Sequence, residues 1–163
     1  MKILIGADRD AAERFLKMAG KVALRSTCLR ARCGAVIVHN YNVIGEGFNS
    51  PPGDLEEQRR CLKDKADLHP DVTDKTCCIP AEQRAIVDAL RRKPNKLFAS
   101  DLYFARIDGK GRIEDCGLPY CTISSKFALD MRLSRVILKH PVGLCAYNAR
   151  EYNQLSFKYG GED

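Results

Sequence analysis

The chain has 163 residues, of which 45% are apolar and 29% charged, a composition typical of one ordinary globular domain over residues 1–163. No apolar run approaches the roughly 20 residues that span a bilayer, so we expect no membrane protein. Its 27 Lys and Arg against 21 Asp and Glu give a net charge of +6, which favours phosphate-bearing partners without identifying one.

The first third of the chain predicts a helix followed by a strand hairpin. Apolar residues recur every three or four positions between Asp10 and Leu24, the pattern of an amphipathic helix. The buried strand Cys33–Val38 and its partner Val43–Phe48 flank a turn at residues 40–42. The pair Pro51–Pro52 then ends the hairpin, because proline cannot continue a central strand.

The remaining chain alternates helices with short buried strands. It opens with a charged segment, residues 54–75, which we interpret as an insertion lying over the sheet. The expected helices are 80–92, 121–132 and 149–157, and the expected strands are 102–105, 135–138 and 144–147. The tail, 158–163, is expected to fray. This order predicts an α/β fold with a mixed sheet and helices on its faces.

Eight cysteines accompany no secretory-type opening segment. We therefore expect a cytoplasmic protein whose cysteines are reduced thiols or metal ligands, not a disulfide framework. Cys28, Cys61 and His69, with Cys77 or Cys78, could form a structural zinc site, although their spacing matches no standard zinc finger.

Two predicted helix starts carry the most specific pattern. One reads Pro80-Ala81-Glu82, and the other reads Pro119-Tyr120-Cys121-Thr122-Ile123-Ser124. The segments 25–28, 34–38 and 45–53 precede them. In order and spacing these segments resemble the cytidine and deoxycytidylate deaminase superfamily, closest to its dCMP deaminase branch. That family carries His-x-Glu at one helix start and Pro-Cys-x-x-Cys at another.

The resemblance implies a three-layer α-β-α sandwich with a five-stranded mixed sheet and both helix starts pointing into one pocket. In the family, one His and two Cys hold a zinc ion whose bound water becomes the nucleophile, and a Glu moves the protons. Glu82 matches that catalytic Glu. Asn49 and Ala81 match substrate-binding positions, where the Asn hydrogen-bonds the sugar.

Two of the three metal positions are altered. Pro80 stands at the His position, Cys121 at the first Cys position and Ser124 at the second. Proline offers no lone pair, and a serine alkoxide is too basic to replace a thiolate as a routine zinc ligand. We therefore expect the family's zinc to be absent or substoichiometric. Both replacements suit a helix start, so the architecture should be spared.

Each candidate residue also has a purely structural explanation. Glu82 could simply interact with the helix dipole, worth ~0.3–1 kcal/mol, and Asn49 could bond its own backbone in a turn. Two further kinds of ligand contact are also candidates. Arginines of the basic loop could contact a phosphate, and tyrosines could stack on a base. The arginines are Arg25, Arg30 and Arg32, and the tyrosines are Tyr120 and Tyr147.

These observations leave three functional hypotheses. The first is a dCMP or cytidine deaminase-like protein whose incomplete zinc site deaminates weakly or not at all, with a cytosine nucleotide as its ligand. The second is an active zinc-dependent deaminase with a displaced ligand set, built on Cys121 with Cys77, Cys78 or Cys116. The third is a non-catalytic nucleotide- or nucleic-acid-binding scaffold, suggested by the basic loop 25–32. We expect a homo-oligomer, at least a dimer.

Overall fold

The computed structural model describes residues 1–72 and 74–160, which form a six-stranded mixed sheet in the order β1-β6-β5-β4-β2-β3. The strands are β1 (Lys2–Ile3), β2 (Arg32–His39), β3 (Asn42–Phe48), β4 (Asp101–Ile107), β5 (Arg135–His140) and β6 (Gly143–Asn148). Only the β4–β5 pair is parallel among these strands. The expected count of five strands was wrong by one, because the two-residue β1 pairs with Cys145 and Ala146.

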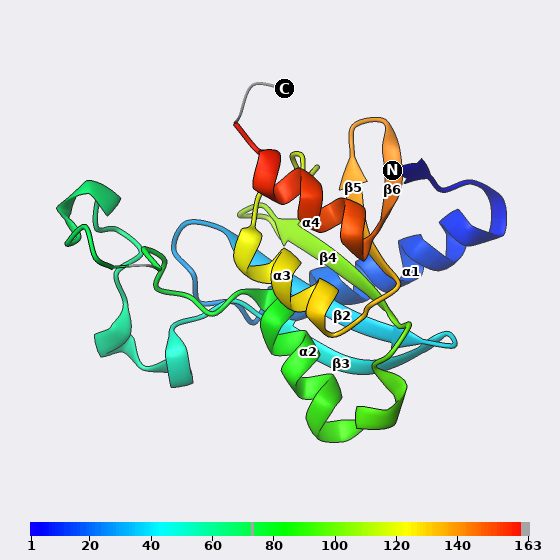
Figure 1. Cartoon of the computed structure of the whole chain (residues 1–163), viewed down its shortest axis with the longest axis horizontal. Helices are drawn as coiled ribbons and strands as arrows, with labels where there is room; N and C mark the ends of the chain where they lie inside the picture. Colours follow the sequence, from blue (N-terminus) through cyan, green and yellow to red (C-terminus); the bar gives the residue numbers. More distant parts are fainter. Residues whose placement is uncertain (73, 161–163) are drawn as a thin grey trace.

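Helices cover both faces of this sheet, which confirms the three-layer α-β-α sandwich (Figure 1). α1 (Gly6–Ala23) packs on one face, where Phe15 and Leu16 belong to one apolar core. On the other face lie α2 (Ala81–Arg92), α3 (Thr122–Asp130) and α4 (Ala149–Lys158), which share a second core with the sheet. No helix within the described residues combines the length and apolar character that crossing a bilayer requires.

Glycines bring two helices directly onto the sheet. A Cβ atom added to Gly34 of β2 would lie 2.2 Å from the Ala19 carbonyl oxygen of α1. One added to Gly47 of β3 would lie 2.3 Å from the Ala81 carbonyl oxygen of α2. Because a side chain cannot fit at either position, these glycines fix how closely α1 and α2 approach. Gly47 thereby sets the place of the α2 N-terminus.

The motif helices each begin one residue later than the sequence predicted. Pro80 is the N-cap of α2, with φ −57° and ψ 145°, because proline's fixed φ suits the extended residue before a helix as well as its first turn. Cys121 is the N-cap of α3, where its Sγ atom accepts the backbone N–H of Ser124 at 3.5 Å. α3 also ends early, since Arg132 has a positive φ of 53°.

The inserted segment does not lie over the sheet, contrary to prediction. Figure 1 shows it projecting beyond the N-terminal end of α2. A 3-10 turn at Pro52–Asp54 leads into it, and its described residues contain two more, at Glu56–Gln58 and Lys65–Asp67, with no longer helix or strand. Without an apolar face of its own, the segment has nothing to pack against the sheet. Residue 73 and most of the tail predicted to fray, 161–163, lie outside the described residues.

Candidate functional site

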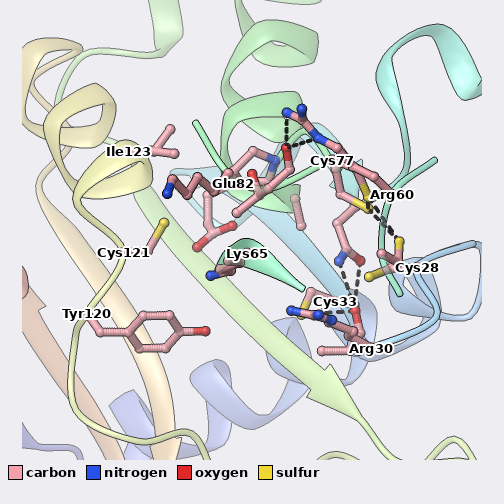
Figure 2. Close-up of a pocket in the computed structure, with 18 of the residues that line it drawn as sticks. Cys28, Arg30, Cys33, Arg60, Lys65, Cys77, Glu82, Tyr120, Cys121 and Ile123 are labelled. Carbon is pink, nitrogen blue, oxygen red and sulfur yellow. Dashed lines mark hydrogen bonds between the residues drawn. The ribbon is translucent and has the colours of Figure 1, made fainter. Parts of the chain in front are cut away.

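The N-termini of α2 and α3 open into one cavity of about 280 Å³, as the family resemblance implied (Figure 2). Glu82 and Ala81 come from α2, and Cys121 and Tyr120 come from the start of α3. Asn49, at the end of β3, and Phe104 of β4 contribute from the sheet. The inserted segment and the loop before β2 supply further lining residues. The cavity is therefore assembled from segments far apart in the sequence.

Glu82 is the second residue of α2 and is buried at the bottom of this cavity, with 7% of its surface exposed. Burial raises the pKa of its carboxyl, and hydrogen bonds from its own backbone N–H and from Ser124 only partly oppose that effect. A carboxyl with a raised pKa exchanges protons closer to neutral pH, as a general acid or base requires. The buried position of Glu82 therefore suits proton transfer, in addition to any interaction with the helix dipole.

The three positions matched to metal ligands do not fit a zinc ion. Pro80 presents a saturated ring beside the cavity. The Ser124 hydroxyl is buried and lies 3.4 Å from the Cys121 Sγ atom, which donates a hydrogen bond to it. Burial, with the nearby Glu82 charge, raises the pKa of the Cys121 thiol. One thiol beside a hydroxyl and a proline ring does not make a catalytic zinc site.

Asn49 is held largely by its own neighbours. Its Oδ1 atom accepts the Cys33 N–H at 2.8 Å and lies 2.6 Å from the Ser26 hydroxyl. Its Nδ2 atom donates to the Ala31 carbonyl at 2.8 Å. The side chain therefore bridges the loop before β2 to the end of β3, a structural role. Since the amide carries two protons, one remains for a ligand in the cavity.

Five cations line the cavity, and the sequence analysis identified only one of them as a candidate. They are Arg30, Arg60, Lys63, Lys65 and Lys75. Glu82 is the one acidic side chain among the lining residues. Figure 2 shows Arg30 on the side of the pocket opposite Tyr120 and Cys121, with Lys65 between them in this view. The charge content of the inserted segment was the only available signal, because no periodic pattern indicated which lysines would face inward.

Several other candidates lie elsewhere. Arg25 stacks over the Phe48 ring at 4.7 Å, and Arg32 donates to the Leu24 carbonyl. Tyr147 is buried in the core with its hydroxyl 2.9 Å from His140 Nε2, so it cannot stack on a ligand. Of the two candidate tyrosines, Tyr120 alone lines the cavity.

The cysteines that precede α2 gather away from Cys121. Cys77 and Cys78 approach Cys61, and Cys28 joins the same group. Burial raises the Cys61 pKa, but hydrogen bonds from Cys77, the Leu29 backbone and Arg59 outweigh it and lower that pKa to about 7.

Two other candidate ligands stand apart from the Cys28 group. His69 is exposed and accepts the Asp71 N–H through Nδ1 at 3.3 Å. Cys116 lines a smaller neighbouring cavity with Cys121, and burial raises its pKa. Within the described residues, neither Cys116 nor Cys121 belongs to a group of three potential metal ligands.

Comparison with known proteins agrees with the motif pattern. The family model of the cytidine and deoxycytidylate deaminase zinc-binding region matches residues 9–138. The chain belongs to this family. The deoxycytidylate deaminase of Saccharomyces cerevisiae is 37% identical over 84 residues, 47% of this chain and 25% of that protein. The deoxycytidylate deaminase of Schizosaccharomyces pombe is 24% identical over 139 residues, 82% of this chain and 37% of that protein.

Solved deaminase structures share the fold. The dCMP deaminase of cyanophage S-TIM5, in complex with dCMP and dUMP, gives a TM-score of 0.55 at 19% identity, covering 82% of each chain. A cytidine deaminase from Burkholderia pseudomallei gives 0.56 at 12% identity, covering 86% of this chain and 94% of that one. These similarities confirm the cytidine deaminase-like α/β sandwich.

The buried Glu82 carboxyl should destabilise the folded state at neutral pH. Because the folded state raises the Glu82 pKa, folding favours the protonated form. The contribution of Glu82 to stability is therefore fully retained below its pKa in the unfolded state, and it is lost as pH rises through its pKa in the folded state. A tenfold difference in the acid dissociation constant between the two states is worth about 1.4 kcal/mol. We expect Glu82→Gln to raise the melting temperature at pH 8, by ~2–4 °C per kcal/mol. The gain should vanish near pH 4, and a gain independent of pH in thermal melts would contradict this explanation.

Proposed function

We propose that this chain is a dCMP or cytidine deaminase-like protein that binds a cytosine nucleotide but lacks the catalytic metal, so that it deaminates weakly or not at all. The observation that carries the proposal is the pairing of Cys121 with a serine hydroxyl and a proline at the three matched ligand positions. Hydrolytic deamination in the family depends on a metal-activated water. Glu82 can move protons, but it has no comparably activated nucleophile to work with.

The electrostatics of the cavity support an anionic ligand. Five cations and one carboxyl line a space of about 280 Å³. That volume lies just below the roughly 300–1,000 Å³ of small-molecule sites, which suits one nucleotide and not a longer strand. The phosphate would be met by Arg30 and the lysines of the inserted segment. The base would then point toward Glu82; a cytosine nucleotide, dCMP, is bound in the structure of the S-TIM5 relative.

The alternative of an active enzyme has one observation in its favour. The cysteines near Cys61 line the same cavity as Glu82, so a metal held there would share the cavity with the ligand. A catalytic zinc needs an open coordination position, however, and four thiolates would leave none. Turnover of dCMP to dUMP by the wild-type chain would favour this alternative.

The scaffold hypothesis rested on the basic loop 25–32. In the structure, Arg25 packs over Phe48 and Arg32 is bonded to the Leu24 carbonyl, so both arginines support the fold. Arg30 turns toward the cavity and donates to the Lys63 carbonyl at 3.1 Å. We therefore propose a small nucleotide ligand in preference to nucleic acid. Association into a homo-oligomer stays a prediction.

The nucleotide proposal predicts that binding depends on the phosphate. We expect dCMP to bind at least roughly tenfold more tightly than deoxycytidine in calorimetric titrations at low salt, because several cations meet the phosphate. The double change Lys63→Gln with Lys65→Gln should remove most of that difference. Lys110→Gln is the matched control, since Lys110 is an exposed lysine in the turn at 108–111, outside the cavity lining. Equal affinities for dCMP and deoxycytidine would refute the proposed phosphate contacts.

A further inference from the structure

Four thiols from three separate segments meet beside the cavity. Cys28 comes from the loop before β2, Cys61 from the middle of the inserted segment, and Cys77 with Cys78 from the approach to α2. The Sγ atom of Cys61 lies 3.0 Å from that of Cys77 and 3.9 Å from that of Cys78. The ligand atoms of Cys28, Cys61 and Cys78 all lie within 4.8 Å of one another. Figure 2 shows Cys28 and Cys77 in the same part of the pocket.

Two of the three sulfur–sulfur distances among Cys61, Cys77 and Cys78 match a tetrahedral metal site. With Zn–S bonds of about 2.3 Å, the sulfurs of a four-thiolate site lie about 3.8 Å apart. The Cys77 and Cys78 sulfurs are 3.7 Å apart, and Cys78 is 3.9 Å from Cys61. Neighbouring residues of an extended chain normally point to opposite sides, yet these two sulfurs converge. The Cys61 and Cys77 sulfurs, 3.0 Å apart, would have to separate by about 0.8 Å to reach the same geometry.

The inserted segment has too little buried surface to hold its conformation alone, so a metal site would stabilise it. Among its described residues between Pro52 and Pro80, Cys61 alone is buried. A stretch of this length with only short 3-10 turns buries too little apolar surface to offset the entropy of ordering it. Small regions without a core are commonly held by a metal or by disulfides. The thiol group lies where the segment meets the rest of the fold.

Hydrogen bonds join the same segments around the thiols. Arg59 donates to the Thr27 carbonyl at 2.7 Å, which ties the inserted segment to the loop before β2. Arg60 donates to the Asp74 and Thr76 carbonyls at 2.9 and 2.8 Å, which brings the end of the inserted segment back to its middle. The thiols therefore lie inside a supported turn, as ligands of a structural metal do.

We propose that Cys28, Cys61, Cys77 and Cys78 form a four-thiolate site for a soft divalent ion, zinc, that fastens the inserted segment to the body of the domain. Thiolate ligands select zinc over magnesium or calcium. Four sulfur ligands close the coordination sphere, so this site is structural and distinct from the altered positions at Pro80 and Ser124. The proposal goes beyond nucleotide binding and does not depend on it.

The site is tested by counting and characterising the metal. The full chain is purified with reductant and without chelator, its zinc is measured, and X-ray absorption at the zinc edge identifies the ligands. We expect roughly one zinc per chain with about four sulfurs at about 2.3 Å. Cys61→Ser should lose this zinc, whereas Cys121→Ser, the matched control at the family's ligand position, should keep it. Failure of the nucleotide proposal would leave these results unchanged.

A second measurement covers the case in which Cys61→Ser does not fold. Chelator is added to the wild-type chain, and amide hydrogen exchange is followed along the sequence. We expect protection to fall within 54–78 while the central strands stay protected, because only the fastening is removed. A shell of nitrogen and oxygen ligands, loss of zinc in Cys121→Ser alone, or a Cys61–Cys77 disulfide with no metal taken up from added zinc would overturn the proposal.

Discussion

Replacing Pro80 by His and Ser124 by Cys together is expected to create a second zinc site and measurable deamination of a cytosine nucleotide. The two new ligands would join Cys121 at adjoining helix starts, where position 124 already lies 3.4 Å from the Cys121 sulfur. Three protein ligands and one open position are what a catalytic zinc needs. Either single change leaves two ligands and should do much less, so the effects should be strongly non-additive. Zinc content should rise from roughly one to two per chain, and dUMP formation from dCMP measures the activity.

The same background tests the role of Glu82. Adding Glu82→Gln to the double variant should keep the second zinc but lower turnover by about 10²–10⁴-fold, the usual contribution of a general acid or base. The fold should tolerate the two restoring changes, because both positions are at helix starts. If the double variant holds two zinc ions yet does not turn over cytidine, deoxycytidine or their phosphates, the pocket is not built for cytosine deamination.

Gly47→Ala is expected to destabilise the domain by at least about 3 kcal/mol, or to prevent folding, because overpacking here meets backbone and not a flexible side chain. The added Cβ would lie 2.3 Å from the Ala81 carbonyl oxygen and 2.3 Å from the Ala85 nitrogen. α2 would have to move off β3, and Glu82 would move with it. Chemical denaturation measures the loss.

Gly109→Ala is the matched control for this change. A Cβ at Gly109 meets no atom within 4 Å, and its φ is not in the left-handed region. We expect its stability to stay within about 0.5 kcal/mol of wild type, as for most exposed substitutions. Equal unfolding midpoints for the two variants would show that the close packing of α2 on β3 does not limit stability.

The sequence predicted the body of the fold because each element there carries a strong local pattern. Apolar spacing indicated α1, and the glycines with short apolar runs indicated β2 and β3. β1 was missed because two exposed residues carry no strand signal; they pair only because β6 has a free edge. The predicted position of the inserted segment was wrong because its actual position is set by the burial of Cys61 and by side-chain hydrogen bonds, not by a periodic apolar pattern.

The sequence predicted the site residues that belong to contiguous motifs. It did not predict those that only the folding of the chain brings to the cavity. Glu82, Ala81 and Cys121 sit at helix starts, and the structure brings them into one cavity. The lysines at 63, 65 and 75 come from a segment without a pattern, so nothing in the sequence indicated that they would line it. His69 was grouped with Cys61 on proximity in sequence, but the folded segment turns its ring toward Asp71.

The most direct test of the incomplete catalytic site is an anomalous-scattering map at the zinc edge, from crystals of wild-type protein purified without chelator. Total zinc alone does not decide the question, because the four thiols around Cys61 are expected to hold one ion. We predict a peak among Cys28, Cys61, Cys77 and Cys78, and none beside Cys121. Stoichiometric zinc bound at Cys121, within reach of Glu82, would contradict the proposal that this family member has lost its catalytic metal.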